Sequence, residues 1–290
     1  MKHQALKYLT RSLGAALVVG VLLAGCTKVS EPFYTVKSVV IDTTHRTVLL
    51  EDYTGHLCTN CAPAADQASA IQDAYKGRVF TISVHAGDFA KPIPSDPYFV
   101  ADFRNETGND WYNETYFNIN VNPKGMVNRR PYKNNVSFGV TEWNEAVESA
   151  LALPKVAIMS VGNTYNAATQ TLDTKVDVRF VDNWAGDVTL TVCILEDSIV
   201  GGQKNNVAGY PKPMIPDFNF MHLLRGSMNG HSFGDLLASD PVAGDVVSRN
   251  FSYDLSTVTW VPRHCSVIAF ISDATTREVL HVAKSGDLVK

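Results

Sequence analysis

The chain lacks most features of nucleic-acid-binding, repeat or disordered proteins. Charged residues make up only 19% of the 290 residues, the formal net charge is −4, and Lys and Arg form no run. A mildly acidic chain without a basic patch argues against nucleic acid as a partner. We find no low-complexity tract and no internal repeat. The apolar and charged fractions are those of a globular protein.

Cysteine is also scarce, with five in the whole chain. Cys58 and Cys61 form a Cys-x-x-Cys motif. A second such motif or a His-x-His cluster, which would complete a zinc site, is missing from the sequence. We therefore expect no metal and no cofactor, with a zinc half-site as the disfavoured alternative. Cys193 and Cys265 lie in apolar, strand-like runs, and we favour two buried free thiols over a bridge between them.

The N-terminus carries processing signals. Basic residues precede an apolar run, Leu13–Leu23, that is too short to span a bilayer. The run ends in Leu-Ala-Gly-Cys26, which resembles a bacterial lipobox. We expect residues 1–25 to be a lipoprotein signal peptide, Cys26 to carry the lipid that anchors the chain in the membrane, and residues 26–45 to be a tether.

Removing the three basic residues of the signal peptide lowers the formal net charge of the chain from −4 to −7.

The expected destination of the chain follows from the residue after Cys26. Because Thr27, and not Asp, follows the lipidated cysteine, we expect the outer membrane, with the periplasmic face and the cell surface both open.

The most informative internal stretch surrounds the Cys-x-x-Cys motif. A strand at residues 47–50 precedes it, an alanine-rich helix at 62–75 follows, and a second strand at 79–84 comes next. Two cysteines three residues apart at the start of a helix lie on one face and within bonding reach. The helix N-terminus favours a thiolate at Cys58. Cys58 is thus the candidate nucleophile for thiol–disulfide exchange, and Cys61 the candidate resolving thiol.

This arrangement resembles the thioredoxin fold. Asp52 stands six residues before Cys58 and is followed by an aromatic residue, as is the buried acid of thioredoxins. The resemblance implies that Asp52 is a general base. A solvated acid is the alternative, and Glu51 is the neighbour most easily confused with it. The resemblance also implies a cis-proline loop at Asn122-Pro123 that docks substrate, with a trans-proline turn as the alternative.

The rest of the chain predicts two domains. Residues 46–153 are expected to form a thioredoxin-like α/β domain, interrupted at 86–120 by a helical insertion rich in aromatic residues. That insertion is expected to form a small core of its own, with a binding surface as the alternative. Residues 154–290 alternate in hydrophobicity and predict an all-β, Ig-like sandwich. Arg225, in its long loop, is expected to clamp a carboxylate or the backbone.

Several motifs in this order resemble one family, the twenty-eight-kilodalton outer membrane proteins of Bacteroidota. They are the lipobox, the stretch from Glu51 to Cys61, Asp102-Phe103-Arg104, Pro123 with Asn128-Arg129, and the Leu223–Gly230 loop. The resemblance implies a lipid-anchored envelope protein and no particular reaction.

Two functions are therefore expected. The first is thiol–disulfide exchange with an envelope protein partner, performed by Cys58, Cys61 and Asp52. The second is a surface-binding or adhesin-like lipoprotein in which Cys58–Cys61 is only a structural disulfide.

Overall fold

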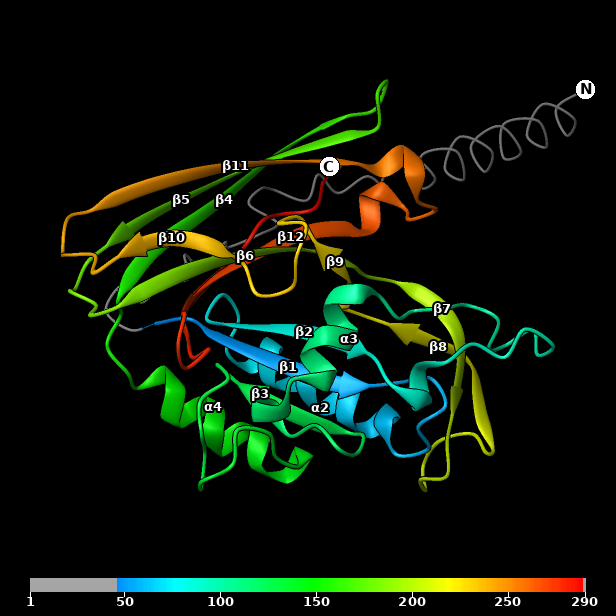
Figure 1. Ribbon diagram of the computed structural model, residues 1–290. Helices are drawn as coiled ribbons and strands as arrows, with labels where there is room; N and C mark the ends of the chain where they lie inside the picture. The colour runs from blue at the N-terminus through cyan, green and yellow to red at the C-terminus, as the bar shows by residue number, and fades with distance from the viewer. Residues whose placement is uncertain (1–45, 289–290) are drawn as a thin grey trace, which may run out of the picture. The chain divides into compact units, whose positions relative to one another are not determined.

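The computed structural model describes residues 46–288, so the predicted signal peptide, Cys26 and the whole tether lie outside the described residues. Between residues 46 and 288 the chain forms thirteen strands and three α-helices (Figure 1). No helix within this range combines the length and hydropathy needed to cross a membrane. The helices are α2 (Cys61–Ala74), α3 (Glu106–Asn113) and α4 (Trp143–Leu151). The strands are β1 (Val48–Thr54), β2 (Val79–His85), β3 (Lys124–Val127), β4 (Ala157–Asn166), β5 (Thr171–Phe180), β6 (Asp187–Glu196), β7 (Ile199–Lys204), β8 (Met214–Phe220), β9 (Leu223–Ser227), β10 (Asp235–Ser239), β11 (Val246–Asp254), β12 (Cys265–Asp273) and β13 (Val279–Lys284).

One eight-stranded sheet runs through the described chain. Its order is β13-β12-β6-β9-β2-β1-β3, and β10 pairs with β6 beside this path. β1 and β2 are parallel, and β1 and β3 are antiparallel. The two halves of the chain meet where β2 pairs with β9, at Ser83 and Leu223.

The prediction of a thioredoxin-like α/β N-terminal domain is wrong. The described chain is mostly β, and β1, β2 and β3 do not form a sheet of their own. The amide of Ser83 donates to the carbonyl of His222 at 2.8 Å, so the free edge of β2 is used by a strand from far down the chain. The expected strand, helix and strand around the cysteines are all present as β1, α2 and β2. Local patterning can predict such elements, but it does not reveal their distant pairing partners.

A β-sandwich occupies the other half of the fold. β4, β5 and β11 form a three-stranded sheet that packs over β6 and β12 of the large sheet. Val176 and Phe180 on one side face Val192 and Ile271 on the other, and all four are buried. Burial alternates along β5, as expected for a strand with one face against a core. This β-rich half agrees with the sandwich expected for residues 154–290.

The aromatic insertion contributes mainly to a core. Trp111 on α3 and Phe117 are fully buried against the opposite face of the large sheet, with Phe270 from β12 in the same cluster. The Trp111 and Phe270 ring centroids are 6.1 Å apart, and the indole N–H donates to the carbonyl of Ser232 at 2.6 Å. These contacts place two rings of the insertion in the core, where each buries a large apolar area, whereas Phe89, Tyr98 and Tyr116 are exposed.

Helices α2 and α4 cover the remaining face of β1, β2 and β3. Val48, Leu50 and Val79 lie in one cluster with Ala68 of α2 and Trp143 of α4. The indole of Trp143 packs closely against Gly125 of β3. A Cβ on Gly125 would lie 2.4 Å from Trp143 Nε1, so only a glycine leaves room for it.

Candidate functional site

Cys58 and Cys61 form a disulfide. Cys58 lies in the turn that follows β1, and Cys61 is the first residue of α2. Their Cα atoms are 5.5 Å apart. The turn that carries them is tight, because the amide of Cys58 donates to the carbonyl of Gly55 at 2.9 Å. Gly55 itself is required by close packing: a Cβ there would lie 2.4 Å from the backbone carbon of Phe89. The helix begins without a side-chain cap on Asn60, so the positive end of the helix dipole lies beside the disulfide.

A segment from the second half of the chain covers this turn. The side chain of Gln203, at the end of β7, donates to the carbonyl of Cys58 at 2.7 Å and to that of Gly55 at 3.3 Å. The amide of Lys204 donates to the carbonyl of His56 at 2.8 Å, and that of Asn206 to Thr59 at 3.0 Å. The exposed fractions of Cys58 and Cys61 are consequently only 2% and 1%. Nothing in the sequence pattern of residues 203–206 predicted this contact.

Asp52 is a buried acid without a partner. Its exposed fraction is 1%, and Oδ1 makes no hydrogen bond in the structure. Burial raises the pKa of this carboxyl to about 8, because the charged form loses its hydration. The alternative of a solvated strand-end acid is therefore excluded.

Glu51 is also buried, but it differs from Asp52 in the face of β1 on which it lies and in having a partner. It points to the opposite face of β1 and accepts three hydrogen bonds from Arg129, at 3.2, 3.0 and 2.7 Å. Both side chains are buried, and the guanidinium lies 4.5 Å from the centre of the Trp111 ring. Glu51 thus belongs to a structural ion pair, and the two acids that the sequence left easy to confuse are separated by the pleat of the strand.

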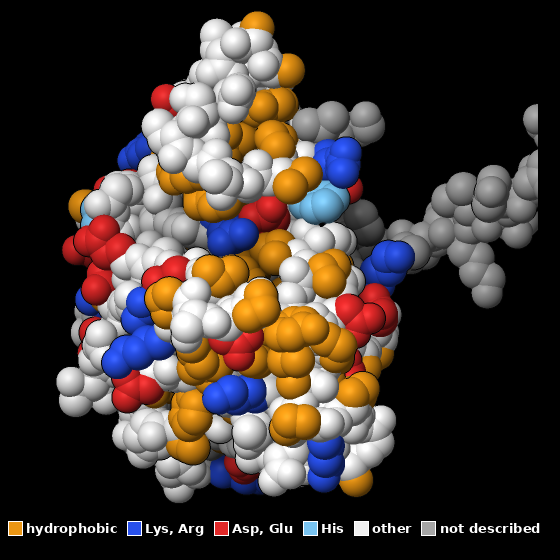
Figure 2. Space-filling view, turned by 90° about the vertical axis from the view of Figure 1, so that its right-hand side faces the viewer, with side chains coloured by type: hydrophobic (Ala, Val, Ile, Leu, Met, Phe, Trp, Pro, Cys, Tyr) orange, Lys and Arg blue, Asp and Glu red, His pale blue; other side chains and the backbone are white. Residues whose placement is uncertain are grey.

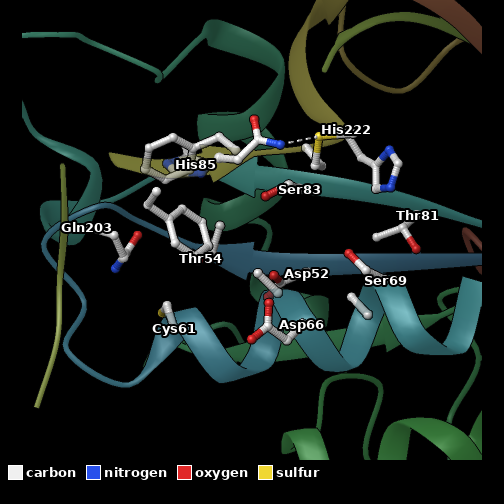
Figure 3. Close-up of a pocket in the computed structure, with 16 residues that line it drawn as sticks. Asp52, Thr54, Cys61, Asp66, Ser69, Thr81, Ser83, His85, Gln203 and His222 are labelled. Carbon is white, nitrogen blue, oxygen red and sulfur yellow. Dashed lines mark hydrogen bonds between the residues drawn. The ribbon is translucent and has the colours of Figure 1, made fainter. Parts of the chain in front are cut away.

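Asp52 and Cys61 face one cavity (Figure 3). Its volume is about 320 Å³, and it lies between α2, the adjacent face of β1 and β2, and the β7–β8 hairpin. The polar side chains lining it are those of Asp52, Thr54, Asp66, Ser69, Thr81, Ser83, His85, Gln203, Asn219 and His222. Cys58 does not line it. Of the two cysteines, only Cys61 is therefore a lining residue of the cavity.

The strand face under the cavity changes character along its length. Val48, Leu50 and Val79 at one end are apolar and covered by helices, whereas the positions that follow on the same face are polar. Among these, Thr81 Oγ1 and His85 Nδ1 are buried without a hydrogen-bond partner. Burial lowers the pKa of His85 to about 3, so its ring is neutral. Unpaired buried polar atoms are unusual in a folded protein, and a bound molecule is one way in which they are satisfied.

Two residues of the cavity went unnoticed in the sequence. The Nδ1 of His222 lies 3.0 Å from the Asp197 carboxylate, and its Nε2 lies 3.0 Å from the amide nitrogen of Gln72. No motif in the sequence pointed to Gln203 as a residue of the site. By contrast, the predicted clamp at Arg225 is confirmed, since its Nε donates to Glu196 at 2.7 Å.

Asn122 and Pro123 stand near the turn but outside the cavity. The bond between them is cis, as the sequence predicted. Lys124 is paired with Tyr53, so Asn122 and Pro123 lie just beyond the last paired position of β3, at the end of β1 that leads to the cysteines. The amide group of Asn122 is buried, and neither its oxygen nor its nitrogen has a partner. A role in docking substrate stays a prediction.

The other two cysteines are free and buried, as favoured from the sequence. Burial raises the pKa of both thiols, that of Cys265 to about 12, so neither is a reactive thiolate. Between residues 46 and 288 no cluster of three His, Cys, Asp or Glu side chains has the geometry of a metal site.

Comparisons with known proteins place the chain in a family. The model of the outer membrane protein Omp28 family matches residues 110–286. Among solved structures, a domain of the outer membrane lipoprotein Omp28 from Porphyromonas gingivalis is 20% identical, with a TM-score of 0.31, over 46% of this chain and 88% of that one. A protein from Agrobacterium tumefaciens is 11% identical, with a TM-score of 0.49, over 82% and 93% of the two chains.

Neither superposition is close enough to guide an argument about the fold, and no curated protein matches the chain. The matched span begins after the disulfide, so the family match says nothing about Cys58 and Cys61. It does cover more than half of the sequence, including β3 and the β-rich half. The chain belongs to the Omp28 family of outer membrane proteins.

Proposed function

We propose that this envelope lipoprotein performs thiol–disulfide exchange at Cys58–Cys61, through the cavity that Cys61 and Asp52 share. The observation that carries the proposal is the position of Asp52. A buried carboxyl without a partner weakens a fold, and this one faces a cavity that is also lined by one cysteine of a disulfide. A strongly shifted acid in a cavity is a candidate proton carrier.

One round of exchange consumes two substrate thiols for each protein disulfide. The thiolate of the first attacks Cys61 Sγ, the Cys58–Cys61 bond breaks, and Cys58 leaves as a thiolate that takes up a proton. The positive end of the α2 dipole stabilises that departing thiolate. A second thiol displaces Cys61, so the substrate is oxidised to its disulfide and the protein is reduced to two thiols.

Asp52 serves as the proton carrier of this cycle. With a pKa of about 8, its carboxyl can give a proton when the protein disulfide opens and accept one when it reforms. The sequence suggested Cys58 as the sulfur that reacts with the partner. We propose Cys61 for that role, because Cys61 lines the cavity and Cys58 is covered by the segment from Gln203 to Asn206.

Turnover of a small disulfide by the purified protein, with a dithiol as the reductant, tests the proposal. We expect catalysis above the buffer rate that is lost in Cys58→Ser and in Cys61→Ser. Cys265→Ala is the matched control, since Cys265 is also buried but takes no part, and it should keep the activity. Catalysis that survives in Cys61→Ser, or a wild-type rate equal to buffer, contradicts the proposal.

A second candidate function, binding of a protein partner, is favoured by one surface. Phe89, Tyr98, Val100 and Val200 are large apolar side chains that are exposed. Tyr98 is joined to β7 because its carbonyl accepts from the amide of Gly202. Figure 2 shows hydrophobic side chains gathered on the face of the molecule that carries β7 and β8. In this alternative the disulfide only holds the turn beneath that surface. A wild-type protein that shows no turnover, and whose adhesion is lost when Tyr98→Ser and Val200→Ser are combined, would favour it.

A further inference from the structure

The cavity is built for a ligand, and its walls restrict the kind of ligand. Three buried polar atoms of lining residues have no partner: Asp52 Oδ1, Thr81 Oγ1 and His85 Nδ1. They come from β1 and β2, and all three residues face the same space (Figure 3). Groups of this kind are normally satisfied by protein, water or ligand. Together they make a polar floor for a small hydrophilic molecule.

Size limits the occupant. A volume of about 320 Å³ lies at the lower end of the range for small-molecule sites. The disulfide turn is covered on its other side by Gln203 and the backbone of residues 204–206. A cysteine held in a folded protein would therefore have to displace this segment to reach either sulfur, whereas a small thiol can enter the cavity and meet Cys61 directly.

Charge limits the occupant further. The ionisable residues lining the cavity are Asp52, Asp66, His85 and His222, and neither Lys nor Arg lines it. His85 is neutral, and His222 is matched by the carboxylate of Asp197. Asp66, exposed on α2, therefore leaves the cavity with a negative charge at its edge. Such a site attracts a cation and repels an anion.

The two neighbouring acids of β1 differ in whether the fold provides a cation for them. The fold supplies Glu51 with a buried cation, Arg129, at 2.7 Å. It supplies Asp52 with none. An ammonium group on a bound ligand would provide Asp52 with the countercharge that Arg129 gives to Glu51. Phe218, Phe220 and Met221 form an apolar wall against which the carbon chain of such a ligand can lie.

From these features we infer that the substrate of the exchange is a small aminothiol, a low-molecular-weight thiol that carries a positive charge, rather than the cysteine of a protein. This inference rests on the proposed function. Two aminothiol molecules react with one protein disulfide. The first bonds to Cys61 and releases Cys58, and the second releases Cys61, giving the aminothiol disulfide and two protein thiols.

Three thiols of equal length and different charge test the inference. The probes are 2-aminoethanethiol, 2-mercaptoethanol and 2-mercaptoethanesulfonate, each added to the full chain, with opening of the disulfide followed by mass spectrometry. Rates are expressed per thiolate, which removes differences in thiol pKa. We expect the cationic thiol to react about tenfold faster than the anionic one, the neutral thiol to fall between them, and a reduced unfolded protein to be slower than all three.

A matched pair of variants assigns the charge effect to the cavity. Asp66→Asn removes the carboxylate at the edge and should shrink the ratio of cationic to anionic rates severalfold. Asp73→Asn removes an exposed carboxylate from the same helix, away from the cavity, and should leave the ratio unchanged. Equal rates for the three thiols, a faster protein thiol, or equal effects of the two variants overturn the inference while exchange itself stands. A disulfide that no thiol opens overturns the proposed function as well.

Discussion

Gln203 donates a hydrogen bond to the carbonyl of Cys58 at 2.7 Å, and through it the end of β7 is fastened to the disulfide turn. This contact joins two parts of the chain that lie 145 positions apart in sequence. It closes one side of the disulfide and leaves the cavity beside Cys61 as the way in.

Replacing Gln203 with Ala should loosen this closure. The carbonyls of Gly55 and Cys58 would each lose a buried donor, and we expect the free energy of unfolding to fall by about 1–2 kcal/mol. We also expect 2-mercaptoethanol to open the disulfide faster than in the wild type. Gln67→Ala, at an exposed position of α2, is the control and should change neither quantity. An unchanged opening rate in Gln203→Ala would show that the contact does not shield the disulfide.

Asp52 should make the protein less stable as the pH rises. Its pKa is about 8 in the folded protein, above the ordinary value of 3.8, so between these values the folded state binds more protons than the unfolded state. Stability therefore falls with rising pH through this window, by up to about 1.4 kcal/mol per pH unit. Asp52→Asn lacks the titration, so its advantage over the wild type should grow from pH 5 to pH 8.

Urea unfolding of both proteins at several pH values measures this difference. Asp66, His85 and His222 also face the cavity, but they are the same in both proteins and cancel in the comparison. A constant difference between the two stability curves would mean that Asp52 does not titrate in this range.

The buried pair of Glu51 and Arg129 should be costly to break on one side only. Arg129→Met leaves an unpaired carboxylate in the core, and we expect the free energy of unfolding to fall by about 3–5 kcal/mol. The double variant Glu51→Leu with Arg129→Met should lose less than the sum of the single variants. Lys133→Ala breaks an exposed ion pair with Glu145 and should have little effect. Additive losses in the double variant would contradict a direct pairing.

Two glycines allow a test of the packing at β3. Gly125→Ala places a Cβ 2.4 Å from Trp143 Nε1, which must shift, and we expect a loss of about 1–3 kcal/mol. Gly139→Ala meets no atom within 4 Å and has an ordinary φ of −75°, so it should be close to neutral. Thermal unfolding of the two variants measures the difference, and equal melting temperatures would contradict the packing described for Trp143.

The elements around the cysteines could be predicted from the sequence because their signals are local. Hydrophobic runs predict β1 and β2, alanine-rich helical spacing predicts α2, and the cis bond at Pro123 was expected from a resemblance. The large sheet could not be predicted, because the pairing of Ser83 with Leu223 depends on residues far apart in the chain. For the same reason Gln203 and His222 were missed, since both reach the cavity from strands or loops with no motif of their own.

The central claim is that a substrate reaches the disulfide through the cavity and meets Cys61. Its most direct test is the rate of mixed-disulfide formation with uncharged hydroxyethyl disulfide, measured by mass spectrometry in Cys58→Ser and in Cys61→Ser. Each variant keeps a single sulfur of the pair. We predict that Cys61 in the first variant reacts at least about tenfold faster than Cys58 in the second, with Asp52→Asn slowing the reaction at Cys61. Equal rates, or a faster reaction at Cys58, would contradict the account.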